Sequence, residues 1–259
     1  MRYGDELLTR FMNLSREQSI RRLKINFLER NERDLPIRGR FITFEGGEGV
    51  GKTTQIALLA AYLRDMGLEV VTTREPGGTP KSERLRRVLL SGKLKYLGPL
   101  AETVVIVAAR IDHFDHLIEP ALSRGAWVLC DRFSDSTRAY QGALGGVKDH
   151  LLNCFDSAAL AQVKPDLTLV LDLAPEVGIA RAAKRRPSGE APDRFEAESR
   201  AFHASLRKAF YDIAQQDPQR CHLIDASQPE DGVFRDICAR VTAKLLTPVK
   251  EISHAGDGA

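Results

Sequence analysis

A glycine-rich run that ends in one lysine and two threonines carries the clearest chemistry of the sequence. It reads Gly46-Gly47-Glu48-Gly49-Val50-Gly51-Lys52-Thr53-Thr54 and matches the phosphate-loop pattern G-x-x-x-x-G-K-[ST]. Glycines let successive backbone N–H groups turn toward phosphate oxygens, and the dipole of a following helix strengthens that anion site. The lysine reaches the β- and γ-phosphates, and the hydroxyl of Thr53 ligates Mg²⁺. The run therefore predicts a nucleoside triphosphate site that uses Mg²⁺.

Two further groups of charged residues follow apolar runs downstream. Arg74 offers a planar guanidinium suited to bidentate phosphate binding, although an ordinary strand-end arginine is the alternative when this loop is considered alone. Asp131 suits a Mg²⁺-organising carboxylate, and Arg132 beside it suits neutralising charge on a transferring phosphoryl group. The phosphate loop alone does not say what receives the phosphate. A kinase also needs a second anion site and an acceptor pocket, and these two stretches are placed to build them.

Five short apolar, β-branched runs must position these groups, at residues 41–45, 69–73, 126–131, 166–173 and 221–225. Helix-length stretches follow them, at 53–66, 80–91, 99–124, 150–163, 175–186, 196–216 and 229–246. Strands that alternate with helices imply βαβ crossovers and a parallel sheet covered on both faces. Ligands of such sheets bind outside the carboxyl ends of the strands. The pattern predicts an α/β fold, a P-loop three-layer α/β/α sandwich with a parallel five-stranded sheet and a lid segment.

Composition excludes several classes of protein. The chain has 259 residues and a net charge of +3, and residues 1–38 alone carry nine basic and six acidic side chains. The remaining residues are therefore balanced, and charge gives no argument for nucleic-acid binding. No apolar window is long enough for a transmembrane helix, and no secretory signal precedes the body. Four cysteines without C-x-x-C spacing are interpreted as reduced thiols of a cytoplasmic protein, with a disulfide or a zinc site as the minor alternative.

The pattern along the chain divides it into three parts. Residues 1–38 show amphipathic spacing with an S-x-x-Q capping box at Ser15 and Gln18, which predicts a helical extension. The alternative is an upstream reading of the start codon, with Met12 as an internal candidate start. Residues 39–247 form the predicted kinase domain, and residues 248–259 form a small, polar, flexible tail. We expect activity to survive removal of 1–38.

Several motifs occur together in the order found in one known family. GGEGVGKTT, TREPGGT, the AAR of residues 108–110 and DRFSDSTRAYQG resemble thymidylate kinases, and PDLTLVLD, PEVGIARAAKRR and DRFE resemble the fourth strand, lid and post-lid helix of that family. The resemblance covers about residues 39–246. It implies Mg²⁺-dependent transfer of the ATP γ-phosphate to dTMP, giving dTDP and ADP in dTTP biosynthesis. It also implies a homodimer, with no nucleic-acid or membrane partner.

The resemblance also implies roles for individual residues. Arg74 would hold the 5′-phosphate of dTMP, Arg132 would reach between donor and acceptor phosphates, and Asp131 would help to position Mg²⁺. Glu48 would lie near the deoxyribose 3′-hydroxyl, and Tyr140 would pack against the sugar. The remaining dTMP-site residues implied are Pro76, Ile106, Arg110, Ser136, Thr137 and Gln141, of which Arg110 and Thr137 would read the thymine edge.

The lid of the family corresponds to about residues 181–193. Its basic run, together with a phosphate loop that lacks interior basic residues, matches a bacterial subtype of the family. The resemblance implies that Arg181 contacts ATP and that Arg185 and Arg186 stabilise transition-state charge beside Lys52, Asp131, Arg132 and Arg74. The alternative is that the basic run has no catalytic role and is simply the solvent-exposed C-terminal end of a helix, where the helix dipole favours positive charge.

Ile106 departs from the family pattern, which usually has an aromatic residue there to stack on thymine. An aliphatic side chain covers a base by dispersion but lacks a π-face, so we expect weaker stacking. A kinase for another pyrimidine monophosphate, such as dUMP, is therefore one alternative function. A non-enzymatic nucleotide-binding switch is a second, more distant one. His113 and His116 form H-x-x-H, which we interpret as helix packing rather than a metal site because no third ligand is near in the sequence.

Overall fold

A single parallel sheet forms the centre of the molecule. The computed structural model describes residues 38–160, 163–185 and 194–246. The strands are β1 (Phe41–Gly46), β2 (Val70–Arg74), β3 (Trp127–Asp131), β4 (Leu167–Asp172) and β5 (Cys221–Asp225). Their order is β2-β3-β1-β4-β5, and every neighbouring pair is parallel. All five predicted strands are therefore present, and the predicted sheet is confirmed.

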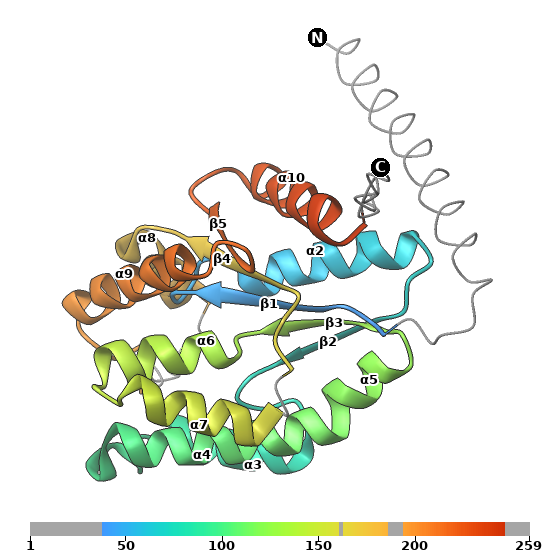
Figure 1. Cartoon of the computed structure of the whole chain (residues 1–259). Coiled ribbons are helices and arrows are strands. Elements are labelled where there is room, and N and C mark those ends of the chain that lie inside the picture. Colours follow the sequence, from blue (N-terminus) through green and yellow to red (C-terminus); the bar gives the residue numbers. More distant parts are fainter. Residues whose placement is uncertain (1–37, 161–162, 186–193, 247–259) are drawn as a thin grey trace, which may run out of the picture.

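Helices cover both faces of this sheet (Figure 1). On one face lie α2 (Lys52–Asp65) and α10 (Glu230–Val241), which pack with Ile42 and Phe44 of β1. On the other face α4 (Gly98–His113), α5 (Glu119–Ser123) and α7 (Asp149–Leu160) pack with Phe41 and Val128, while α9 (Arg200–Gln216) packs on Val170 of β4. Side chains alternate between the faces of a strand, so Phe41, Thr43 and Glu45 share the second face. The three-layer arrangement predicted from the sequence is confirmed.

Local sequence explains where several helices begin. The side chain of Thr79 caps α3 (Pro80–Leu90) and forms a reciprocal capping box with Ser82, and Pro80 occupies the first turn, where no backbone donor is needed. Ser199 caps α9 by accepting from the N–H of Phe202. Gly51 precedes α2 in a left-handed conformation (φ 100°) that only glycine adopts easily. The glycine of the phosphate loop thus also starts its helix.

Two predicted stretches differ in the structure. The stretch at 99–124 divides into α4, a π-helical segment η2 (Phe114–Ile118) and α5, with Pro120 in the first turn of α5, because proline cannot supply the N–H that would continue the helix. Residues 134–144, which carried no predicted helix, form α6 (Ser134–Thr137) and the π-helical η3 (Arg138–Leu144). These polar residues lack amphipathic periodicity, and tertiary contacts to the sheet decide their conformation.

The remaining elements are α8 (Pro175–Arg185), which leads toward the predicted lid, and the short segments η1 (Lys95–Leu97) and η4 (Thr242–Leu246). The predictions for the extension at 1–37, most of the lid at 186–193 and the tail at 248–259 lie outside the described residues. Within the described part, no helix is both long and apolar enough to cross a membrane.

Candidate active site

The phosphate loop joins β1 to α2 at the carboxyl edge of the sheet, as predicted. Gly46, Gly49 and Gly51 have φ of 126°, 66° and 100°, and a Cβ on Gly49 would collide with the carbonyl oxygen of Gly178 in α8. Lys52 is buried, and its Nζ donates to the carbonyl oxygens of Gly47 at 2.8 Å and Gly46 at 3.4 Å. Burial and the nearby Arg132 charge lower the pKa of Lys52. The lysine is thus held inside the loop that it serves.

Thr53 and Asp131 meet at the mouth of this loop. The hydroxyl of Thr53 donates to Oδ2 of Asp131 at 3.3 Å, which brings one hydroxyl and one carboxylate oxygen to the same exposed point. No cluster of three or more His, Cys, Asp or Glu residues suited to a metal occurs among the described residues. This sparse set of oxygen donors fits Mg²⁺, which keeps several waters and is held mainly by substrate phosphates.

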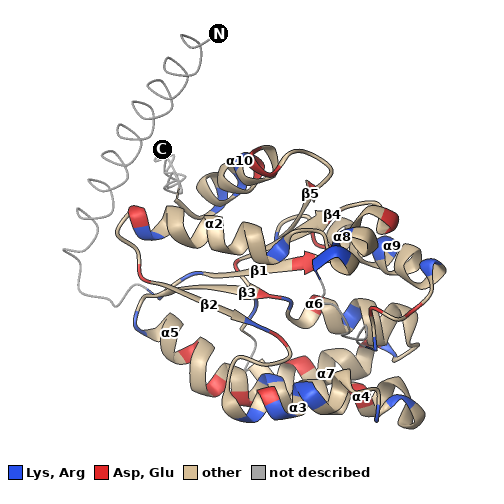
Figure 2. Ribbon diagram, turned by 180° about the vertical axis from the view of Figure 1, so that it is seen from behind, with Lys and Arg blue, Asp and Glu red and all other residues tan. Residues whose placement is uncertain are grey.

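A large cleft extends from the phosphate loop along the ends of β2 and β3. It has a volume of about 1690 Å³, and Lys52, Arg74, Asp131, Arg132 and Arg185 line it. Charged stretches of both signs gather where these strands end (Figure 2). Arg74 is open to solvent: its side chain is 55% exposed and pairs with Glu83 at 3.0 Å. The structure thus brings the predicted phosphate-binding residues into one cleft.

Arg132 occupies the centre of the site. Its Nη2 contacts Oε1 of Glu48 at 2.6 Å, and its Nη1 donates to the carbonyl oxygen of Gly46 at 2.9 Å. The hydroxyl of Tyr140 donates to the same Glu48 oxygen at 3.1 Å. Although burial favours the protonated acid, the charges of Arg132 and Lys52 outweigh it and lower the pKa of Glu48 to about 2. The guanidinium of Arg132 also lies over the Tyr140 ring, 5.3 Å from its centroid.

A second, more enclosed pocket of about 620 Å³ adjoins the cleft and shares Glu48, Glu75, Arg86 and Arg132 with it. Its other lining residues are Pro76, Leu89, Leu90, Ile106, Arg110, Phe133, Ser136, Thr137, Tyr140, Gln141 and Phe195. Every residue predicted for the dTMP site except Arg74, which lies in the cleft, therefore lines this pocket. The guanidinium groups of Arg86 and Arg132, where the pocket meets the cleft, and the apolar side chains elsewhere in its lining suit the phosphate and the base of a nucleoside monophosphate.

Arg110 is held firmly in the lining of this pocket. Its side chain is 1% exposed, and its three nitrogens donate to Glu75 (2.8 Å), Asp156 (3.3 Å) and Thr137 (2.9 Å). The two carboxylates outweigh burial and raise the pKa of Arg110 further. The side chain therefore stays charged and cannot turn away from the pocket without leaving two acids unpaired.

Glu75 connects Arg110 to His113, and sequence reasoning missed it. Its Oε1 lies 3.1 Å from Nδ1 of His113, whose Nε2 lies 2.7 Å from the Thr73 hydroxyl. A carboxylate only accepts, so Nδ1 donates and, in the neutral ring, Nε2 accepts from Thr73. His113 is completely buried in this chain of bonds, whereas His116 is exposed, which agrees with the packing interpretation of His113. The glutamate lies inside the TREPGGT motif but has no chemical signal of its own.

Phe195 lines the pocket, and Glu102 and Arg194 support its neighbours from outside; sequence reasoning missed all three. Phe195 packs edge-on against Tyr140 with ring centroids 5.0 Å apart, and Arg194 pairs with Glu102 at 2.7 Å. Glu102 also accepts from the side chain of Gln141 at 3.3 Å, which holds that predicted residue in place. Ile106 lies on α4, buried beside the pocket. The segment after the lid thus closes the pocket from a distant part of the sequence.

The two described lid arginines occupy α8. Arg181 and Arg185 are both exposed, and Arg185 lines the cleft, whereas Arg186 lies outside the described residues. At the start of this helix, a Cβ on Gly178 would collide with the carbonyl oxygen of Glu48, so the backbones of α8 and the phosphate loop touch. The first turn of α8 is therefore anchored against the phosphate loop, and the helix carries its arginines from there.

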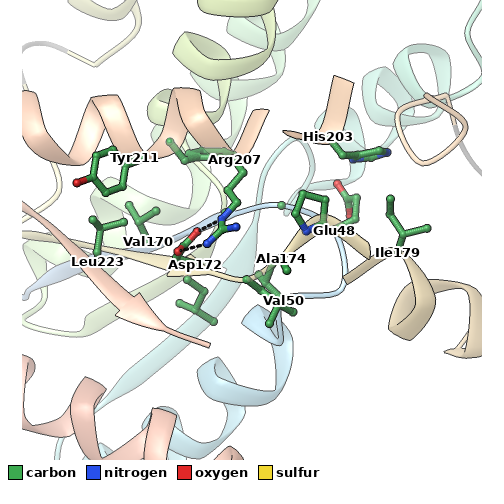
Figure 3. Close-up of a pocket in the computed structure, with 16 residues that line it drawn as sticks. Glu48, Val50, Val170, Asp172, Ala174, Ile179, His203, Arg207, Tyr211 and Leu223 are labelled. Carbon is green, nitrogen blue, oxygen red and sulfur yellow. Dashed lines mark hydrogen bonds and ion pairs between the residues drawn. The ribbon is translucent and has the colours of Figure 1, made fainter. Parts of the chain in front are cut away.

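A third cavity lies on the far side of Glu48, between β4, α8 and α9 (Figure 3). Arg207 forms two short bonds to the Asp172 carboxylate (2.6 and 2.7 Å), and His203 faces the cavity from α9. Its Nε2 has no hydrogen-bond partner among the described residues. Most of the remaining lining is apolar, and the cavity borders the phosphate loop without sharing Arg132 or Arg110.

The fold and the paired cavities define a class of protein. A phosphate loop after the first strand of a parallel sheet is the mark of a P-loop nucleotide-binding protein. A separate enclosed pocket, joined to the phosphate cleft at Arg132, is what a phosphotransferase needs for its acceptor.

Comparison with known proteins identifies the family. The thymidylate kinase family model matches residues 44–237. Thymidylate kinase from Bradyrhizobium sp. (strain BTAi1) is 56% identical over 218 residues, covering 84% of this chain and 96% of that protein. The enzyme of Nitrobacter hamburgensis is 54% identical over 210 residues, 81% of this chain and 91% of the relative. A crystal structure of thymidylate kinase from Ehrlichia chaffeensis superimposes with a TM-score of 0.63 at 34% identity, covering 79% of this chain and 99% of that one. The chain belongs to the thymidylate kinase family.

Proposed function

We infer that this protein is a thymidylate kinase, a nucleoside monophosphate kinase that transfers the γ-phosphoryl group of ATP to dTMP. The observation that carries this function is the enclosed pocket whose arginine, Arg132, also faces the phosphate cleft, in a chain of this family. A nucleotide-binding switch would not need that second pocket. Phosphoryl transfer depends on positioning and charge stabilisation rather than on a strong base, and the contacts of Arg132 and Lys52 suit that task.

We propose that the predicted residues act as the resemblance implies. Residues Gly46 to Thr54 would hold the ATP phosphates, with Arg181 contacting ATP, and Arg185 and Arg186 would join Lys52 and Arg132 around the transferred group. Arg74 would bind the acceptor phosphate in the cleft, while Arg110 and Thr137 would face the thymine edge. Glu48 would accept from the deoxyribose hydroxyl, and Tyr140, which already donates to Glu48, would fill the space beside the sugar.

Mg²⁺ is part of this proposal, with Thr53 and Asp131 as its protein ligands. When bound, the ion would neutralise charge on the phosphates and orient them. The protein contributes the rest: Lys52 and Arg132 supply fixed positive charge, and the acceptor pocket positions the acceptor beside them. Chelation with EDTA should abolish turnover and excess Mg²⁺ should restore it.

A coupled assay for ADP release tests the function directly. With ATP and Mg²⁺ present, we expect turnover with dTMP to exceed turnover with dUMP, UMP and dCMP. Preference for another acceptor would favour the alternative function suggested by Ile106, a kinase for a different pyrimidine monophosphate. ADP release that no acceptor stimulates would contradict the kinase.

A homodimer belongs to the same proposal. Leu100, Val104 and Ile111 are exposed and recur along one face of α4, which suits burial against a second copy of this chain. Val104→Glu should convert the dimer to a monomer in light scattering, and a wild-type chain that is already monomeric would contradict this interface.

The division of the chain and its location complete the proposal. The sheet begins at Phe41 beside Gly39, whose N–H donates to Leu122, so we propose 39–247 as the catalytic domain. A chain that lacks residues 1–38 should keep its turnover, and loss of activity would show that the extension belongs to the enzyme. The free thiols favour the cytoplasm.

A further inference from the structure

Arg132 adopts a strained backbone conformation. With φ of 69°, it is the single non-glycine residue with a positive φ among the described residues. A side chain in the left-handed region costs conformational energy, and such strain persists only where surrounding contacts impose it. The groups that impose this conformation therefore determine where the guanidinium of Arg132 lies.

Glu45 clamps the turn that follows Arg132. It is the fifth residue of β1, is completely buried, and points to the face of the sheet that α6 covers. Its Oε1 accepts from the backbone N–H groups of Phe133 at 2.8 Å and Ser136 at 3.2 Å, and its Oε2 accepts from the Ser136 hydroxyl at 2.6 Å. The hydrogen bonds recorded for its carboxylate all go to this one turn. A single carboxylate thus holds the turn at both ends.

The Ser136 hydroxyl connects this clamp to the guanidinium of Arg132. Nη1 of Arg132 lies 3.2 Å from the hydroxyl oxygen, and a guanidinium can only donate. The hydroxyl therefore accepts from Arg132 and gives its own proton to Glu45. The direction of the chain of bonds, from Arg132 through Ser136 to Glu45, follows from the chemistry of the three groups.

Packing alone does not explain a carboxylate at this position. Burial and the like charge of Asp135 raise the pKa of Glu45 to about 7, although Arg132 and the hydrogen bonds partly oppose this. Asp135 is buried on the same face but pairs with Arg220 at 2.6 Å, away from Arg132. An apolar side chain would fill the core without the cost of desolvating an acid.

We propose that Glu45 is a positioning residue for phosphoryl transfer, which holds Arg132 in its strained, catalytically useful conformation through the 132–136 turn. It touches neither substrate. The inference rests on the proposed kinase function, because Arg132 matters to the reaction only if the cleft transfers a phosphoryl group. It assigns a role to an acid that lies outside both cavities.

Glu45→Gln tests this role. The amide keeps an oxygen for the two backbone N–H groups but places an NH₂ group against Ser136, which reverses that hydrogen bond. We expect kcat to fall about 10- to 100-fold. This loss is equal to or slightly smaller than the loss caused by removing one preorganised hydrogen-bond donor from an active site. The KM values for ATP and dTMP should change less than threefold. Asp135→Asn is the matched control, since it removes an equally buried carboxylate from the same turn, and its kcat should stay near wild type.

Ser136→Ala provides a second route, which keeps the Glu45 carboxyl group and removes the hydroxyl that joins it to Arg132. It should lower kcat several-fold, and adding it to Glu45→Gln should cost little more than Glu45→Gln alone, because both break one chain of bonds. A crystal structure of Glu45→Gln should show Arg132 leaving the left-handed region. Wild-type kcat in either variant, equal losses in Asp135→Asn, or a loss confined to KM would overturn the proposal. If the wild-type protein released no dTMP-dependent ADP, the proposed kinase function itself would be wrong. If the wild type released ADP and one of these contrary outcomes followed, only the proposed role of Glu45 would be wrong.

Discussion

The phosphate cleft and the acceptor pocket share Arg132 but are built differently. In the cleft, Arg74 is 55% exposed and pairs with one partly exposed acid. In the pocket, Arg110 is 1% exposed and has three hydrogen-bond partners. Exposed ion pairs contribute little to stability, while a buried one fixes geometry and leaves a costly unpaired charge when it is broken. The pocket is therefore organised before any ligand binds, whereas Arg74 in the cleft is free to adjust to the phosphate that it meets.

Two carboxylates three residues apart show the same contrast. Glu48 faces Arg132 and Lys52 and has its pKa lowered to about 2, whereas Glu45, buried beside Asp135, has its pKa raised to about 7. Both residues are glutamates of one short segment. The charges that tertiary structure places around them, and not their type or sequence position, determine their protonation.

Arg132 should give the largest effect, because it serves both regions. Arg132→Ala should lower kcat by at least about 10²- to 10³-fold, since it removes the fixed positive charge between donor and acceptor phosphates. Steady-state kinetics of ADP release measure the loss, and circular dichroism checks that the fold is retained. Near-normal turnover would refute the role assigned to this arginine.

Arg110 and Arg74 should separate the two regions by stability. Arg110→Ala leaves Glu75 and Asp156 without their shared partner, so unfolding in urea should show a loss of about 3–5 kcal/mol. Arg74→Ala should change stability by no more than about 0.5 kcal/mol, although both variants should raise the KM for dTMP. Equal losses of stability would break the distinction between an organised pocket and an adjustable cleft.

Glu48 and Glu45 should shift stability with pH in opposite directions. The lowered pKa of Glu48 contributes on the order of 3 kcal/mol that is fully present above pH 4.5 and is lost as pH falls through about 2. The raised pKa of Glu45 means that the folded state keeps a proton that the unfolded chain releases. Its contribution is therefore present below pH 4.5 and lost as pH rises through about 7.

Urea unfolding across this pH range measures both effects, with the variants Glu48→Gln and Glu45→Gln as non-titrating references. Relative to Glu48→Gln, the wild type should lose stability only under acid conditions. Relative to Glu45→Gln, it should lose stability between pH 4.5 and 7. Parallel profiles for the two pairs would contradict the opposite environments.

Ile106 should give the smallest effect, inside the organised pocket. Ile106→Phe adds a π-face beside the base, and an aromatic pair contributes about 0.5–1.5 kcal/mol, so dTMP should bind about 2- to 10-fold more tightly. Calorimetry with dTMP measures the change, and ATP affinity should stay constant. Unchanged dTMP affinity would show that the pocket does not use this position for stacking.

Local patterns predicted the part of the site that one short segment builds. The phosphate loop, the five strands and the positions of Arg74, Asp131 and Arg132 at strand ends follow from spacing and apolar runs, and the structure has them there. The helical form of 134–144 was missed, because contacts of Glu45 with Ser136 stabilise it rather than its own periodicity. Phe195 was missed for the same reason, since it approaches Tyr140 from 55 residues further along the chain.

The sequence by itself determined the chemistry: a phosphate loop, the arginines near it and the parallel sheet that carries them. Those features depend on short-range rules of glycine geometry and strand burial. Only the tertiary structure decided which groups are charged, which are fixed and which remain open, because hydrogen bonds and Coulomb interactions act between residues that the fold brings together. Glu45 is the clearest case: an unremarked acid in an apolar strand becomes, in the folded chain, the anchor of the turn behind Arg132.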